Sequence, residues 1–320
     1  MPINADKPNL WKADTRASVD QFNQWFMKFA PKAYRDTRKL TVESVEQGLV
    51  LTQDLTRITP EVLKANPAIL QTLRMSTCPP LARDRLIGLA DSTKNFVGCL
   101  EEGKLPKLLS AALLDVHLGK VVAILSQMLD TDIFPWLTEK RRPKKEERYR
   151  SSTIVADRLC GAVAEPIVRN AQEKRQLALV QKYLIQRGYK LKAHPPAIAL
   201  TQMEPGTFCF RLNILVKSGK IEIKTVKIPI DVVIQPKKIK LPHLPVLIEA
   251  KSAGDFTNVN KRRKEEAIKI AQIKATYGES VIFVLFLCGY FDAAYLGYEA
   301  AEGIDWIWEH RMSDFDQLGL

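Results

Sequence analysis

Two apolar segments of the sequence carry charged side chains where a buried strand ordinarily has none. Asp231 lies inside the segment 228–234, and Glu249 and Lys251 end the apolar run 246–251. Because side chains alternate along a strand, Glu249 and Lys251 must face the same side of a sheet, and Asp231 joins them if the two strands are neighbours. Two carboxylates in a small space need a compensating proton or cation, and Mg²⁺ is a hard ion that takes oxygen ligands. Such an ion can orient a water and stabilise charge on a phosphate, to which a nearby lysine adds positive charge.

A purely structural explanation competes with this one. Asp231 could lie at a strand end, and Glu249 could form a structural ion pair with Lys251. For any one carboxylate alone we would prefer that explanation. For the set we favour a functional site, because three ionisable groups in two successive apolar strands incur a desolvation cost that needs a reason.

The elements around these residues predict a mixed sheet flanked by helices. A long amphipathic helix covers about 154–187. Strict alternation at 208–216, a turn at Ser218-Gly219 and a returning strand at 221–234 predict a hairpin. A short strand at 246–250, a basic helix over about 258–277 and a buried strand at 281–287 follow. The fold class is therefore α/β, or α+β, with helix, three strands, helix and strand in that order.

The rest of the chain predicts a second, helical part. Residues 1–137 have helical periodicity and form the predicted N-terminal helical domain. Residues 138–152 contain seven Lys or Arg and one Pro, which is typical of a solvated basic linker, although such a segment could also lie along a phosphate backbone. The second domain is predicted at 153–320, with an acidic helical tail after residue 300.

With these elements in place, the residues resemble the PD-(D/E)XK nuclease superfamily. The resemblance rests on Pro229-Ile-Asp231, followed 18 residues later by Glu249-Ala-Lys251, on an αβββαβ core over about 154–290. The longer string LIEAKSAGDFTN at 247–258, with KRRKEE after it, is similar to type II restriction endonucleases of the XamI kind, as is STCPPLARDRLIGL at 76–89. One departure is Ile230, which separates a proline and an aspartate that are often adjacent in the family.

The resemblance implies roles for individual residues. Asp231 and Glu249 would ligate Mg²⁺, and Lys251 would position or activate the attacking water. Family members often carry another acidic residue on the helix before the sheet, and Glu165 matches it best. An equally good explanation of Glu165 is a carboxylate that stabilises a helix N-terminus beside Pro166.

The basic helix is a candidate DNA-binding element. Its residues follow the strand of Glu249 directly, so they would be placed beside the scissile phosphate. Phosphate contact or a solvated face is the preferred explanation for the lysines, and base reading is a less favoured alternative for Asn260, Arg262 and Arg263. Glu265 or Glu266 could be a further acid that supports the site, although for Glu265 exposed pairing with Lys269 one turn later is the commoner role. The DNA-binding candidates are Lys251, Ser252, Asn258, Asn260, Lys261, Arg262, Arg263 and Lys264.

Composition bounds the function further. The formal net charge is +12, and residues 151–300 alone carry a net +10, which favours a polyanionic partner. The longest apolar run, 281–291, is too short to span a bilayer, so no membrane association is expected. No signal peptide is evident at the N-terminus, which predicts a cytoplasmic protein.

The predicted function is a Mg²⁺-dependent type II restriction endonuclease that cleaves double-stranded DNA at a short, palindromic site. A homodimer is expected, because a two-fold symmetric protein matches a palindrome. A cognate DNA methyltransferase is expected in the same restriction-modification system, though not as a stable partner. Two alternatives remain: a repair or junction nuclease that reads DNA structure, and a non-catalytic DNA-binding protein on the same fold.

Overall fold

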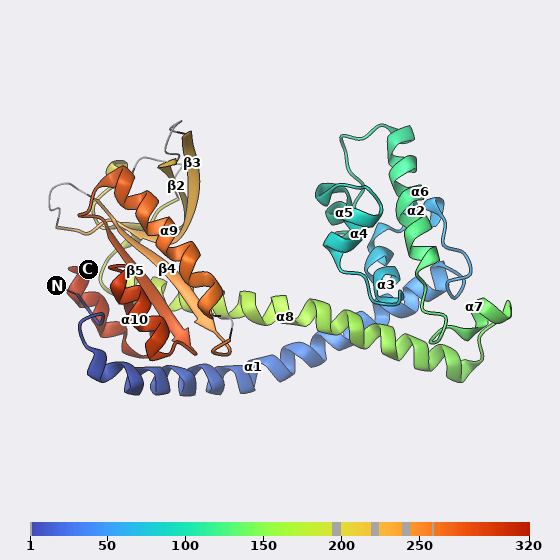
Figure 1. Cartoon of the computed structure of the whole chain (residues 1–320), viewed down its shortest axis with the longest axis horizontal. Coiled ribbons are helices and arrows are strands. Elements are labelled where there is room, and N and C mark those ends of the chain that lie inside the picture. The colour runs from blue at the N-terminus through green and yellow to red at the C-terminus, as the bar shows by residue number, and fades with distance from the viewer. Residues whose placement is uncertain (1, 194–199, 219–223, 239–243, 258) are drawn as a thin grey trace. The chain divides into compact units, whose positions relative to one another are not determined.

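The computed structural model describes residues 2–193, 200–218, 224–238, 244–257 and 259–320, leaving aside the side chains of 201, 218, 224 and 260–263. The chain divides into two compact units. A sheet unit comprises Met1–Phe29 and Arg169–Leu320, and a helical unit comprises Ala30–Val168. Two long helices, α1 (Pro8–Leu51) and α8 (Lys145–Gln186), contribute residues to both units (Figure 1).

The sheet unit is built on six strands in the spatial order β1-β2-β3-β4-β5-β6. The strands are β1 (Lys190–Leu191), β2 (Thr207–Ser218), β3 (Lys224–Ile234), β4 (Val246–Ala253), β5 (Ile282–Gly289) and β6 (Asp305–Trp308). Pairing is antiparallel from β2 to β4 and parallel at β1–β2, β4–β5 and β5–β6. The sheet is therefore mixed, as the alternating and apolar segments predict.

Helices cover both faces of this sheet. The apolar faces of α9 (Val259–Tyr277) and α10 (Ala293–Ala301) pack with Leu247 and Leu285 in one core. The last turns of α8 and the 3-10 segment η3 (Glu309–Leu318) pack with the neighbouring strand residues in a second core on the other face. Figure 1 shows α9 running alongside β4 and β5, with its axis nearly aligned with these strands. The alternation of β4 and β5 thus places successive side chains in opposite cores.

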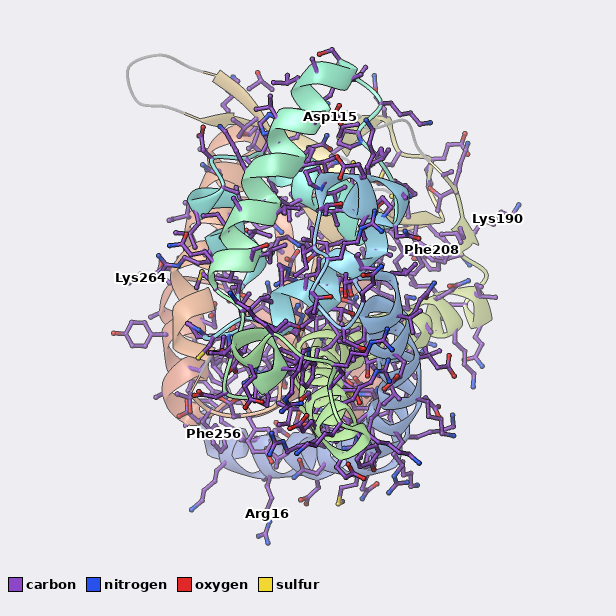
Figure 2. The ribbon with its side chains drawn as sticks, turned by 90° about the vertical axis from the view of Figure 1, so that its right-hand side faces the viewer. Arg16, Asp115, Lys190, Phe208, Phe256 and Lys264 are labelled. Carbon is purple, nitrogen blue, oxygen red and sulfur yellow. The ribbon has the colours of Figure 1, made fainter. Side chains whose placement is uncertain are left out.

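The beginning of α1 belongs to the sheet unit. Trp11 meets Trp306 edge to face at 5.5 Å, and the Ser18 hydroxyl accepts a hydrogen bond of 2.7 Å from the Gly289 amide. Gly289 has a φ of 103°, and a Cβ atom there would lie 2.1 Å from the Ala253 carbonyl oxygen, so glycine is required at this end of β5. The opposite face of α1 is solvated, as Arg16 shows in Figure 2.

The helical unit packs short helices around the second part of α1 and the first part of α8. Apart from the isolated bridge Thr77↔Leu129, its regular structure is helical. Its core includes Leu49, Leu125 and Trp136, and the Trp136 indole donates to the Asp54 carbonyl at 2.8 Å. The short helices are α2 (Pro60–Ala65), η1 (Pro67–Ile69), α3 (Leu70–Met75), α4 (Arg83–Leu89), α5 (Lys94–Glu101), α6 (Ala111–Gln127) and α7 (Pro135–Glu139).

The segment 138–152 is not the solvated linker that its composition suggests. From Lys145 onward it forms the first turns of α8, and Ser151 is fully buried. Two of its arginines form ion pairs: Arg148 lies 2.8 Å from Asp54, and Arg141 lies 2.7 Å from Glu147. Most of its other charged side chains are exposed, so the segment keeps a solvated face while it continues into a packed helix.

The acidic end of the chain also differs from the predicted helical tail. Before η3 it forms β6, the sixth strand of the sheet, in which Trp306 and Trp308 are fully buried. A four-residue strand is too short to show an alternating pattern in the sequence.

Among the described residues, no helix combines the length and hydrophobicity that crossing a membrane requires.

Candidate active site

A fork between β3 and β4 brings the three predicted residues together. The antiparallel ladder pairs Ile234 with Val246, Val233 with Leu247 and Val232 with Ile248, and then ends. Asp231 and Glu249 are the next residue of each strand. The strands separate here, so the Asp231 carboxylate replaces the next ladder partner and accepts a hydrogen bond of 2.9 Å from the Ala250 amide. The Ala250 N–H would otherwise have no partner on β3 once the ladder ends. Its hydrogen bond therefore fixes the position of the Asp231 carboxylate.

Two ammonium groups hold the Glu249 carboxylate. Lys251 lies 3.3 Å from its Oε1, and Lys269 of α9 donates to its Oε2 at 2.7 Å. Lys269 also donates to the Pro229 carbonyl at 2.6 Å. All three side chains are largely buried, with 12% exposure for Glu249, 20% for Lys251 and 14% for Lys269. Both oxygens of Glu249 thus have a cationic partner.

Lys251 has a second acidic partner on the covering helix. Its Nζ lies 3.1 Å from Oε1 of Glu266, which is only 2% exposed. The hydroxyl of Tyr295, from α10, donates to Oε2 of the same carboxylate at 2.8 Å. From the opposite face of the sheet, Gln176 of α8 donates to the Lys251 carbonyl at 3.3 Å. The side chain and the backbone of Lys251 are therefore both anchored.

Burial and charge shift the protonation of two of these groups. Burial, and then the nearby charge of Glu249, raise the pKa of Asp231 to about 6. For Lys251, burial alone would lower the pKa, but Glu249 and Glu266 outweigh it and raise the pKa. Asp231 is therefore ionised only near neutral pH and above, whereas Lys251 keeps its proton.

The structure gives the surroundings of three other predicted residues, and their roles stay predictions. Glu165 is exposed and belongs to the helical unit, whereas the fork lies in the sheet unit. Lys264 is exposed on α9 (Figure 2), and Ser252 is half-buried at the end of β4. The expected exposed pair of Glu265 with Lys269 gives way to the contact of Lys269 with Glu249. Asn258 lies outside the described residues, as do the side chains of Asn260, Lys261, Arg262 and Arg263.

Lys269, Tyr295 and Gln176 contact the site although the sequence analysis does not select them for it. Glu266 and Lys269 are three residues apart, so they share one face of α9, and this spacing was the available signal. Nothing in the spacing of Tyr295 or Gln176 points to β4, because their contacts depend on how three separate elements pack.

The two carboxylates of the fork suit a metal ion that takes most of its other ligands from water and substrate. Among the described residues, no group of three or more His, Cys, Asp and Glu side chains could hold a metal ion. Mg²⁺ is commonly bound by one or two carboxylates, with waters and substrate phosphates as its other ligands. The Asp231 and Glu249 carboxylates, close enough to raise the pKa of one of them, fit such an ion.

Comparison with known proteins identifies the family. The family model of the XamI restriction endonucleases matches residues 53–308. The chain belongs to this family and is a DNA-hydrolysing enzyme. It is 55% identical to the type II restriction enzyme SalI of Streptomyces albus G over 317 residues, which cover 99% of each chain. No solved structure matches the chain significantly.

Proposed function

We propose that the protein is a Mg²⁺-dependent type II restriction endonuclease that hydrolyses phosphodiester bonds of double-stranded DNA at a short palindromic site. Its PD-(D/E)XK core is formed by α8, β2, β3, β4, α9 and β5 in the sheet unit, and the helical domain predicted at 1–137 corresponds instead to the helical unit, Ala30–Val168. The observation that carries the proposal is the meeting of Asp231, Glu249 and Lys251 at one fork of a mixed sheet. The family match and the SalI relative support it.

Asp231 and Glu249 would hold the metal ion. A bound Mg²⁺ supplies a Lewis acid beside the phosphate and lowers the pKa of a coordinated water. Asp231, ionised above its pKa of about 6, and Glu249 would fix its position in the fork. The hydrogen bond from the Ala250 amide to Oδ2 keeps the Asp231 carboxylate oriented.

Lys251 would act as a fixed positive charge rather than as a base. Because Glu249 and Glu266 raise its pKa, it is protonated at neutral pH and cannot accept a proton from water. Its ammonium can instead orient the attacking water by hydrogen bonding and stabilise negative charge that develops on the phosphate. Glu266 and Tyr295 hold it in place for this role.

DNA would approach at the end of β4 and the beginning of α9. Ser252 follows Lys251 in the strand, and Lys264 is exposed in the first turns of α9. We propose that these residues, with Asn258, Asn260, Lys261, Arg262 and Arg263, contact phosphates and base edges. The phosphate contacts should fix register, and the Asn and Arg side chains offer base-reading groups.

A homodimer would bring one such fork to each strand of a palindrome. The system would include a cognate methyltransferase that protects host DNA without forming a stable complex, and the enzyme would act in the cytoplasm.

The test is cleavage of a long, unmethylated DNA of known sequence in Mg²⁺ or in EDTA, with Glu249→Gln beside the exposed Glu265→Gln as a matched control. Discrete fragments that require Mg²⁺ and Glu249, and survive Glu265→Gln, are expected. Intact DNA in every lane would overturn the proposal, and a Mg²⁺-dependent smear would replace it with a structure-reading nuclease.

A further inference from the structure

Lys269 occupies a position in the fork that the roles of Asp231, Glu249 and Lys251 leave unexplained. Its ammonium bridges the two strands where their ladder has ended, donating to the Pro229 carbonyl of β3 at 2.6 Å and to Glu249 of β4 at 2.7 Å. It reaches them from α9 and is 14% exposed. A buried lysine in such a place compensates a buried carboxylate that would otherwise be destabilised.

The two lysines of the fork differ in the partners that remain to them if Glu249 binds another cation. Lys251 still has the buried carboxylate of Glu266 at 3.1 Å. Within the described part of the chain, Lys269 has one ion pair, with Glu249, and it otherwise donates to a neutral carbonyl, although its charge also acts on the nearby Asp231 carboxylate. A cation that takes Glu249 Oε2 therefore competes with Lys269, whereas Lys251 stays held.

We propose that Lys269 is a built-in counterion that holds Glu249 when no metal is present and competes with the divalent ion for that carboxylate. The inference rests on the proposed function, because it takes Glu249 as a metal ligand. Lys269 is thus a positioning residue. It links β3 to β4 at the fork, it keeps the Glu249 carboxylate oriented, and it lowers the affinity of the free enzyme for the metal ion. Removal of its charge should strengthen metal binding and weaken the metal-free fold.

The experiment is calorimetric titration of the full-length protein with Ca²⁺ in the absence of DNA, together with thermal unfolding in EDTA. The key variant is Lys269→Met, which keeps the length of the side chain and removes its charge. Lys274→Met is the matched control: it removes one positive charge from the same helix at a residue that pairs with the exposed Glu279. Lys269→Arg retains the charge, and Lys269→Gln retains a donor for Pro229 if the Met variant does not fold.

We expect Lys269→Met or Lys269→Gln to bind Ca²⁺ about tenfold more tightly than the parent protein, because the competing ammonium is within a few ångströms of the carboxylate. Lys274→Met and Lys269→Arg should stay within about twofold, and the metal-free Tm should fall in Lys269→Met more than in Lys274→Met. Equal or weaker binding by Lys269→Met overturns the inference, as does equal tightening by Lys274→Met.

A parallel titration of Glu249→Gln separates the two proposals. If Ca²⁺ binding is unaffected by Glu249→Gln, the proposed metal site itself is wrong. If binding requires Glu249 but is not tightened by loss of the Lys269 charge, only the role of Lys269 is wrong.

Discussion

Each unit of the chain buries a cluster of charged groups, and the two clusters differ in how far the protein alone neutralises them. In the helical unit, the nearly inaccessible Glu101 pairs with two guanidinium groups, of Arg74 and the half-exposed Arg83. In the sheet unit, three carboxylates face the two ammonium groups of Lys251 and Lys269. Those carboxylates are Asp231, Glu249 and Glu266.

The difference separates a structural cluster from a site that is prepared for a ligand. Around Glu101 positive charge is in excess, and the surplus guanidinium reaches solvent, where hydration stabilises it. Among the described side chains of the fork, negative charge is in excess once Asp231 ionises, and this charge lies in a largely buried position. Unneutralised buried charge is unfavourable unless a cation binds, so the fork is the cluster that calls for an added ion.

The largest expected difference between the two clusters is in catalysis, because a change of Lys251 at the fork should slow DNA cleavage. Lys251→Met removes the charge held by Glu249 and Glu266, and we expect single-turnover cleavage to slow by about 10³-fold, the effect of losing one preorganised charge stabiliser. Lys274→Met should cleave at the parental rate. Parental cleavage by Lys251→Met, measured on the same DNA, would show that the fork is not the active site.

In the helical unit the largest effect should be on stability. Glu101→Ala leaves the buried Arg74 without its carboxylate, and we expect the free energy of unfolding to fall by about 3 kcal/mol in urea titrations. Glu102→Ala, which breaks only the exposed pair with Lys104, should change it by less than about 0.5 kcal/mol. A small loss of unfolding free energy in Glu101→Ala would contradict the view that Glu101 neutralises the buried Arg74.

At the fork, removing a carboxylate should instead stabilise the metal-free protein. The pKa of Asp231 is raised from 3.8 to about 6 in the folded state, so the native protein binds the proton more tightly than the unfolded chain. Stability contributed by the protonated form is therefore lost as the pH rises from about 4 to 6 and stays lost above it.

Asp231→Asn avoids that loss. In EDTA at pH 8 we expect it to exceed the parent protein by about 1–2 kcal/mol in the free energy of unfolding, and the difference should vanish near pH 4. A variant less stable than the parent at pH 8 would contradict the view of the fork as a site of excess negative charge.

The two clusters also differ in how much of them the sequence predicts. The strand period places Glu249 and Lys251 on one side, and the short chain between Asp231 and Glu249 makes neighbouring strands plausible, so these residues could be selected from local pattern alone. The mixed α/β fold follows from the same patterns and is confirmed. The catalytic roles and the identity of the core stay predictions.

What the sequence could not supply depends on contacts between distant segments. Arg148 pairs with Asp54, 94 residues away, so the charge of 138–152 misleadingly suggests a linker. Glu165 is in the same long helix as Gln176, which reaches the backbone of β4, but it lies in the part of that helix that belongs to the helical unit, and its role stays a prediction. Helical periodicity does not tell which turn of a 42-residue helix meets the sheet.

The smallest predicted effect tests whether the anchor of Lys251 matters for the reaction. Tyr295→Phe removes the hydroxyl that donates to Glu266 at 2.8 Å and leaves the ring packed in its core. Loss of a typical hydrogen bond costs about 1 kcal/mol, and if that cost appears in the transition state we expect a fall of about fivefold in the single-turnover rate. Glu266 would then hold the ammonium less rigidly, which should slow cleavage but leave DNA affinity in Ca²⁺ within about twofold.

Tyr298→Phe, on the exposed side of the same helix, provides the matched control. A parental rate in Tyr295→Phe would show that Glu266 holds Lys251 without help from the Tyr295 hydroxyl, whereas a parallel loss of DNA affinity would show that the hydroxyl stabilises the core instead.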